Sequence, residues 1–181
     1  MHRCPRARSP EEILYHDTER GKPSHDEHYL FEMLILEGMQ AGLSRNTILK
    51  KRENFRKAFD NFDYHKIQNY DESKSLELMN NPGIIRNRLK IEATIKNAKS
   101  FIAIQKEYGS FDNYIWGRTK GKQICNHFQK LEDYPTTSQL SDIISKDLKK
   151  RGMNFVGSTI IYSYLQAIGI MNDHLQDCEY K

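Results

Sequence analysis

The sequence predicts an all-α protein in which residues 1–181 form a single domain. Three observations favour this fold class. Apolar residues recur every three or four positions along most of the 181 residues, capping residues precede these stretches, and glycine follows them. No stretch alternates apolar and polar side chains clearly enough to predict a strand. A chain of this length suits one hydrophobic core.

The first helix is expected between the capping residues Ser24 and Asp26 and the glycine Gly42. Its apolar face also carries Glu37 at helical spacing. An ionised carboxylate in such a face costs several kcal/mol unless it is paired or hydrogen-bonded. Two roles are therefore open for Glu37. It either forms an ion pair or cap at the helix end, or it accepts hydrogen bonds from a ligand in a pocket.

Two more amphipathic stretches follow along the chain. Residues 44–59 place apolar side chains on one side with basic residues around them, which predicts a second helix. Residues 84–109 predict a longer helix that ends at Gly109. Turns are expected at residues 82–83 and 134–135, where proline interrupts the pattern.

Residues 140–152 and 158–169 predict two helices joined by the short link "MNFVG". This pattern is typical of a helix-hairpin-helix, in which backbone amides at the start of the second helix hold a DNA phosphate. The residues expected to contact DNA there are Lys149, Lys150, Arg151 and Gly157. An ordinary helical hairpin with a solvated basic turn is the alternative.

Composition restricts the function classes. Hydrophobic residues make up 38% and charged residues 29% of the chain, and no apolar run is long enough to span a membrane. The N-terminus "MHRCPRARSP" is basic but lacks the apolar core of a signal peptide, so we expect a cytoplasmic protein. A net charge of +4 permits a nucleic-acid partner without requiring one.

The three cysteines are an odd number, which argues against a disulfide framework and leaves metal or free-thiol roles open. A Cys/His pair lies near each end of the chain, and together they are Cys4, His16, His174 and Cys178. A Cys2His2 set suits tetrahedral zinc and would hold down both termini. Seven histidines offer other combinations, and the alternative is that His174 and Cys178 are ordinary surface or core residues.

Several segments carry a resemblance to a known family along nearly the whole chain. They are "RCP" at 3–5, "YHD" at 15–17, "LFEMLILEGMQAGLS" at 30–44, "LKKRENFRKAF" at 49–59, "GIIRNRLKI" at 83–91 and "LKKRGMNFVGSTIIYSYLQAIGIMNDH" at 148–174. In these segments the chain resembles the type I DNA-3-methyladenine glycosylases. The resemblance implies a helix-hairpin-helix DNA glycosylase fold whose termini are joined by a structural zinc site. It also implies a monomer that removes 3-methyladenine from double-stranded DNA.

The resemblance also implies roles for individual residues. It assigns the zinc to Cys4, His16, His174 and Cys178, base recognition to Glu37, and a place in the base pocket to Tyr15. The enzyme would flip the damaged nucleotide out of the stack, and Leu43 is a candidate wedge for the gap that the base leaves. A simple core contact at a helix end is the alternative for Leu43.

Three positions depart from the family's motifs. The family has tryptophan in "RCPW", "EWG" and "LSW", where this chain has Arg6, Arg20 and Arg45. A tryptophan face attracts a cationic base, whereas a guanidinium repels it. Two explanations are open. The arginines make the protein a weak enzyme or a DNA-binding protein without excision, or they reflect CGG codons that the native organism reads as tryptophan.

A third reading of the whole chain is a helical zinc protein with no nucleic-acid role, which a salt-dependent DNA titration would test. Two residues have no assigned function. Cys125 is expected to be a packing residue rather than a reactive one, and Trp116, the only tryptophan, is equally expected to be a core anchor.

Overall fold

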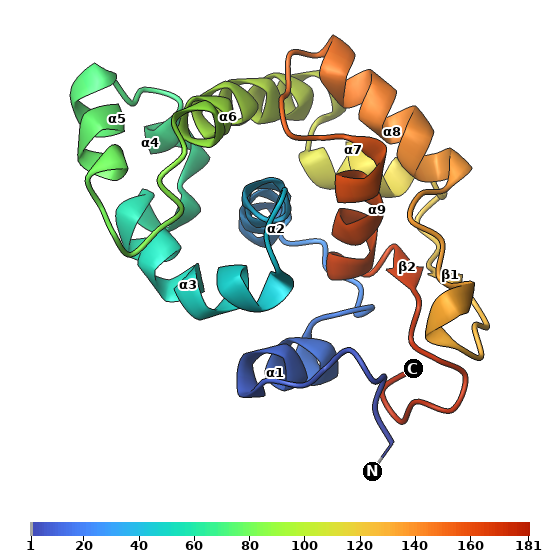
Figure 1. Cartoon of the computed structure of the whole chain (residues 1–181). Coiled ribbons are helices and arrows are strands. Elements are labelled where there is room, and N and C mark those ends of the chain that lie inside the picture. Colours follow the sequence, from blue (N-terminus) through green and yellow to red (C-terminus); the bar gives the residue numbers. More distant parts are fainter. Residues whose placement is uncertain (1) are drawn as a thin grey trace.

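The computed structural model describes residues 2–181, and the described chain is mostly helical (Figure 1). The helices, in chain order, are α1 Pro10–Thr18, α2 Glu27–Met39, α3 Arg45–Ala58, α4 Tyr64–Ile67, α5 Glu72–Met79, α6 Arg88–Tyr108, α7 Phe111–Gly117, α8 Gln139–Lys150 and α9 Ser158–Ala167. Short 3-10 turns cover Asp60–Phe62 and Leu131–Asp133. Among residues 2–181, no helix combines the length and apolarity needed to cross a bilayer.

The prediction of a mostly helical fold is confirmed, and the prediction that strands are absent is wrong. Strands β1 Ile124–Cys125 and β2 Met171–Asn172 pair in parallel, with Ile124 opposite Met171. Backbone hydrogen bonds of 2.8 Å from Ile124 N to Ile170 O and 3.0 Å from Asn126 N to Asn172 O extend the ladder. Two residues are too few to show a period of two, so the sequence pattern carries no signal for them.

Helix α2 occupies the centre of the fold, with α3, α6 and α9 arranged around it (Figure 1). All ten residues from Leu30 to Met39 are buried, which is what a helix enclosed on every side requires. Its start agrees with the sequence prediction, because the Asp26 side chain accepts a hydrogen bond from Tyr29 N at 2.7 Å. The central position of α2 explains why its apolar pattern is so dense.

Two buried charges attach neighbouring helices to α2. Glu32 accepts hydrogen bonds from Arg52 Nε at 2.7 Å and Arg56 Nε at 3.0 Å, which joins α2 to α3. Lys90 of α6 donates to the carbonyls of Met39 at 2.8 Å and Ala41 at 2.6 Å. A cation at the C-terminal end of a helix is favourable, because the last carbonyls there lack intrahelical donors. Lys90 therefore fixes the backbone that leads out of α2.

Helices α8 and α9 form a hairpin whose link is held by α6. Asn97 of α6 donates to Asn154 O and accepts from Asn154 N, both at 2.9 Å. Within the hairpin, Ser145 Oγ donates to Val156 O at 2.6 Å. The link is therefore rigid and fixed in register against the core.

The end of α9 is pressed against the segment between α1 and α2. Gly169 has a φ of +79°, and a Cβ built there would lie 2.2 Å from the carbonyl carbon of Lys22. Gly42 has a similar φ of +77°, but a Cβ there would meet nothing within 4 Å. The two glycines share a backbone conformation and differ in the space around them.

We predict that Gly169→Ala lowers the free energy of unfolding by at least about 2 kcal/mol more than Gly42→Ala, since only Gly169 adds a backbone clash to the strain of positive φ. Urea titrations of both variants measure the difference. Equal losses would show that the chain does not pass so closely at Gly169.

Candidate functional site

The two ends of the chain meet at a buried cluster of cysteine and histidine (Figure 1). The ligand atoms of Cys4, His16, His174 and Cys178 all lie within 4.8 Å of one another. The predicted convergence of these four residues is confirmed, and the cluster can hold a metal ion. His16 comes from α1, Cys4 from the segment before it, and the other two from the C-terminal segment after β2.

The contacts within the cluster are close. Cys178 Sγ lies 3.5 Å from His174 Nδ1 and 3.6 Å from His16 Nε2. Cys4 Sγ lies 3.7 Å from His174 Nδ1, and the two histidine nitrogens lie 3.0 Å apart. The four ligand atoms therefore surround one point.

Each histidine uses its second ring nitrogen to bind an oxygen outside the cluster. His16 Nδ1 lies 2.7 Å from Asp17 Oδ1, and that carboxylate also accepts a 2.8 Å hydrogen bond from Arg3 Nε. His174 Nε2 lies 2.9 Å from the backbone oxygen of Arg20. Metal-binding histidines are typically oriented by a carboxylate or a carbonyl in this way. The outer contacts point both free nitrogens into the cluster.

The thiol of Cys4 is prepared for metal binding. Burial raises its pKa, but hydrogen bonds with His16 and His174 outweigh burial and bring that pKa to about 4. Cys4 is therefore a thiolate at neutral pH, which is the form that binds metals.

A cavity of about 480 Å³ opens next to the cluster. The residues that line it include Arg6, Tyr15, Arg20, Gln40, Arg45 and Gln166. They come from the N-terminal segment, α1, the ends of α2 and α3 that face each other, and α9. The cavity is large enough for a small organic molecule. His16 belongs both to its wall and to the metal-binding cluster.

Glu37 lies behind this cavity. Its side chain is 4% exposed, and its Oε1 accepts a 3.2 Å hydrogen bond from Arg45 Nη1. A second cavity of about 10 Å³ is lined by Glu37, Tyr15, Gln40 and Arg45, and the last three also line the larger cavity. A space of about 10 Å³ has room for roughly one water molecule. Arg45 therefore stands between Glu37 and the larger cavity.

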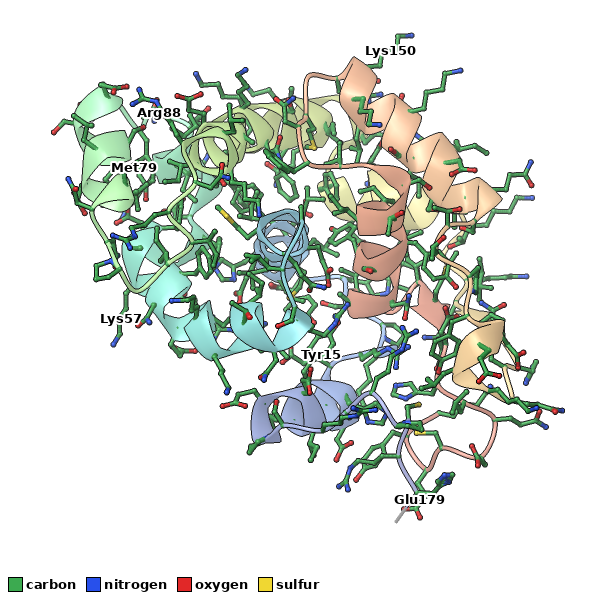
Figure 2. All side chains as sticks on the ribbon, viewed as in Figure 1. Tyr15, Lys57, Met79, Arg88, Lys150 and Glu179 are labelled. Carbon is green, nitrogen blue, oxygen red and sulfur yellow. The ribbon has the colours of Figure 1, made fainter. Side chains whose placement is uncertain are left out.

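Tyr15 points from α1 toward α3 (Figure 2). Its hydroxyl is buried and has no hydrogen-bond partner among residues 2–181. Burial raises the pKa of Tyr15 to about 12, so the hydroxyl is neutral at physiological pH. A buried donor without a partner costs free energy, and a ligand in the cavity would supply one.

The α8–α9 hairpin carries three basic side chains, which differ in whether their charge is free to bind a phosphate. Lys149 and Lys150 are exposed, and Figure 2 shows Lys150 pointing away from the body of the protein. Arg151, by contrast, binds Glu107 at 2.6 Å and Asp147 at 2.8 Å. Its charge is neutralised within the protein, so of the three basic residues singled out in the sequence it is the least suited to a phosphate.

The remaining sequence-predicted residues lie as follows. Leu43 is 41% exposed in the turn after α2, so a core contact does not account for it. Gly157 is the N-cap of α9 and supplies no side-chain cap to the amides that follow. Trp116 is a core anchor, 4% exposed, with Nε1 donating to Ser24 O at 2.9 Å. The expected packing role of Cys125 is wrong, because this cysteine is exposed on β1.

Sequence reasoning missed three residues that complete the site. Gln166 accepts a 2.9 Å hydrogen bond from Arg20 Nη2, and the ring of Tyr134 lies below the guanidinium groups of Arg6 and Arg20. Asp17 orients His16. Of these, only Asp17 had a signal, because it directly follows a predicted ligand in "YHD".

Solved structures with this fold define the chain as a DNA glycosylase. A crystal structure of 3-methyladenine DNA glycosylase I superposes with a TM-score of 0.95 at 44% identity, covering 98% of each chain. A variant of 3-methyladenine DNA glycosylase I in complex with 3-methyladenine superposes with a TM-score of 0.94 at 35% identity, covering 96% of this chain and 94% of that one.

The chain belongs to the methyladenine glycosylase family, whose model matches residues 6–181. DNA-3-methyladenine glycosylase of Haemophilus influenzae is 46% identical over 169 residues, which cover 93% of this chain and 91% of that protein. DNA-3-methyladenine glycosylase 1 of Escherichia coli is 43% identical over 172 residues, covering 95% and 92%. The resemblance seen in the sequence motifs is confirmed.

The pair of Glu37 and Arg45 makes stability depend on pH. Burial raises the pKa of Glu37, although Arg45 opposes this. Because folding then favours the protonated carboxyl, stability is lost as pH rises from the unfolded pKa through the folded pKa.

We predict that Arg45→Met raises the pKa of Glu37 further and costs roughly 2 kcal/mol of stability at neutral pH, less than a fully buried pair because Arg45 is partly exposed. The control is the double variant Glu37→Gln/Arg45→Met, which lacks both charges of the ion pair. The stability deficit of the single variant relative to the double should grow between about pH 5 and about pH 8. A deficit that stays constant over this range would contradict the ion pair.

Proposed function

We propose that the protein excises 3-methyladenine from alkylated double-stranded DNA, acting as a monomer in the cytoplasm, where bacterial DNA lies. The observation that carries this proposal is the buried carboxylate of Glu37 beside the unpartnered hydroxyl of Tyr15, next to a cavity large enough for a base. A base stacked in DNA cannot reach such a site, so the damaged nucleotide must be flipped out of the helix, which costs a few kcal/mol.

The chemistry that the protein must supply is modest. Methylation at N3 makes the adenine cationic within DNA, so the bond from the base to C1′ of the sugar is already weak. Water attacks C1′ and gives up one proton to solvent, the bond to the base breaks, and the base leaves with the bonding electrons as a neutral molecule. The Glu37 carboxylate favours the positive charge of the bound base and accepts hydrogen bonds from its amino edge. Tyr15 forms the neighbouring wall and offers its free hydroxyl.

The DNA backbone would be held by the α8–α9 hairpin, as in a helix-hairpin-helix. The amides at the start of α9 follow Gly157, which has no side chain to cover them, and Lys149 and Lys150 add positive charge. Leu43 is exposed at the turn after α2 and is the side chain best placed to enter the gap in the stack. Arg151 is left out of this contact because of its ion pairs.

Zinc is the metal that suits the Cys4, His16, His174 and Cys178 cluster. Bond lengths of about 2.3 Å to sulfur and about 2.0–2.1 Å to nitrogen place neighbouring ligand atoms of a tetrahedral zinc site roughly 3.4–3.8 Å apart. The sulfur-to-nitrogen distances of 3.5, 3.6 and 3.7 Å match this range, while the two histidine nitrogens, 3.0 Å apart, would have to separate by a few tenths of an ångström. With all four positions supplied by the protein, the site is closed, so the metal's role is structural.

A second candidate function is DNA binding without excision. The ion pair between Arg45 and Glu37 favours it, because it uses the carboxylate that the base would need. The two candidates differ in one measurement, the release of base from methylated DNA. Release by the purified protein supports excision, whereas binding without release supports the second candidate.

We predict that Glu37→Gln lowers the rate of 3-methyladenine release at least tenfold, about the effect of losing one charge-assisted contact, while binding to undamaged DNA stays within about twofold, since phosphates dominate that binding. Base release is measured by chromatography and DNA binding by fluorescence anisotropy. Equal losses in both assays would remove Glu37 from base recognition.

We predict that Cys178→Ser abolishes stoichiometric zinc and lowers the melting temperature, because the two chain ends lose their common ligand set. Cys125→Ser is the matched control, because the thiol of Cys125 is exposed and does not belong to the cluster. Zinc is measured by elemental analysis. A wild-type protein without zinc, or a Cys178→Ser variant with unchanged melting, would contradict the assignment.

A further inference from the structure

Three arginines from separate parts of the chain line one cavity. Arg6 lies before α1, Arg20 just after it, and Arg45 begins α3. At these three positions the family's motifs have tryptophan, whereas this chain has arginine. The neighbouring motif residues are the same in this chain as in the family. The structure adds that the three departures line a single cavity, so one property of its lining changes at all of them together.

Each of these arginines lies over the ring of a tyrosine. The guanidinium carbon of Arg6 lies 5.1 Å from the centre of the Tyr134 ring, and that of Arg20 lies 5.7 Å from the same centre. The guanidinium carbon of Arg45 lies 5.2 Å from the centre of the Tyr15 ring. Each position therefore places a flat group over an aromatic face at the cavity.

Six other arginines bind carboxylates within 3.0 Å, and they are Arg3, Arg52, Arg56, Arg88, Arg118 and Arg151. Three of the six also lie over tyrosine rings, so the ion pairs, not the ring contacts, distinguish them from Arg6 and Arg20. Within the described residues, Arg6 and Arg20 take part in no ion pair. Arg45 is paired with Glu37, the carboxylate that the proposed reaction needs.

Three cations also oppose the proposed ligand. A cationic base is held by aromatic faces, with stacking of about 1–3 kcal/mol per base, and is repelled by guanidinium groups. Arg45 further neutralises Glu37 and closes it off from the larger cavity. The rest of the site, with its buried carboxylate and unpartnered tyrosine hydroxyl, suits a polar cationic ligand. The positive charge of the three arginines is unfavourable for the same ligand.

We infer that the native cell places tryptophan at positions 6, 20 and 45, because the gene has CGG there and this organism reads CGG as tryptophan. CGG differs from the usual tryptophan codon UGG by one base, so a single change in decoding accounts for all three positions, whereas independent substitutions would require three coincidences. The inference about the cavity wall rests on the proposed function, but the identity of the three residues can be measured without it.

The gene and its protein provide the first test. A tagged copy is expressed from its own codons in the organism that carries it, and its tryptic peptides are sequenced by mass spectrometry. We expect tryptophan, and no tryptic cleavage, at positions 6, 20 and 45. Arg8 is the matched control, because it lines the same cavity outside the motif positions and should remain arginine, encoded by a codon other than CGG. Arginine at any of the three positions in that protein would overturn the inference.

The second test measures whether tryptophan at the three positions of the cavity lining increases base release. Arg6→Trp/Arg20→Trp/Arg45→Trp is made in a host with the standard code and compared with the unmodified sequence and with Arg86→Trp, whose arginine is exposed and does not line the cavity. We expect the triple variant to release 3-methyladenine at least about tenfold faster and Arg86→Trp to have no such effect. An unchanged rate would overturn the aromatic wall. If peptides show tryptophan and neither protein releases base, the proposed function fails and the decoding inference stands.

Discussion

The meeting of the two chain ends at Cys4, His16, His174 and Cys178 is the contact on which the site depends. Helix α1 lies at the edge of the fold, where it packs against α3 (Figure 1). It is also attached to the cluster, through His16, and the carbonyl of Arg20 just after it accepts from His174. Tyr15, the neighbour of His16, and Arg20 both line the large cavity. The geometry of that wall therefore follows from the geometry of the cluster.

The opposite wall is fixed by charges buried around α2. Glu32 holds α3 through Arg52 and Arg56, and Lys90 holds the backbone at the end of α2. Glu37 is presented between these two anchors, in a place where ionisation is costly unless a positive group is near. Burial makes ionisation of this carboxylate cost free energy, and it also strengthens the electrostatic attraction between the carboxylate and a cationic ligand. Rigid support on both sides is what allows a small set of groups to discriminate one base from another.

Much of this arrangement could be predicted from the sequence. The long helices α2, α3, α6, α8 and α9 follow from period and caps, and the convergence of the four cluster residues follows from their chemistry together with the resemblance. The short helices were not predicted, since a single turn or two shows little periodicity. In the structure, Ser9 and Glu12 form a capping box at the start of α1. The pairing of β1 with β2 joins residues 47 positions apart and leaves no local pattern.

The interaction partners of the charged residues could not be predicted from the sequence either. Lysine and arginine in a sequence look alike whether they face solvent, cap a helix or bind a carboxylate. Lys90 is buried on the end of α2, Arg151 is neutralised by Glu107 and Asp147, and Lys149 and Lys150 remain exposed. These outcomes depend on which helices pack together. The three cavity arginines are different, because in the sequence each already departs from the motif of the resemblance that surrounds it.

The central claim, that the terminal cluster holds the cavity wall, is tested most directly by amide hydrogen exchange on the zinc-loaded protein before and after removal of zinc with a chelator. The account predicts that residues 10–20, including α1, lose protection on chelation, while α2 and α6 keep theirs, because those helices are held by the core. Unchanged protection in α1, or an equal loss in all three helices, would contradict it.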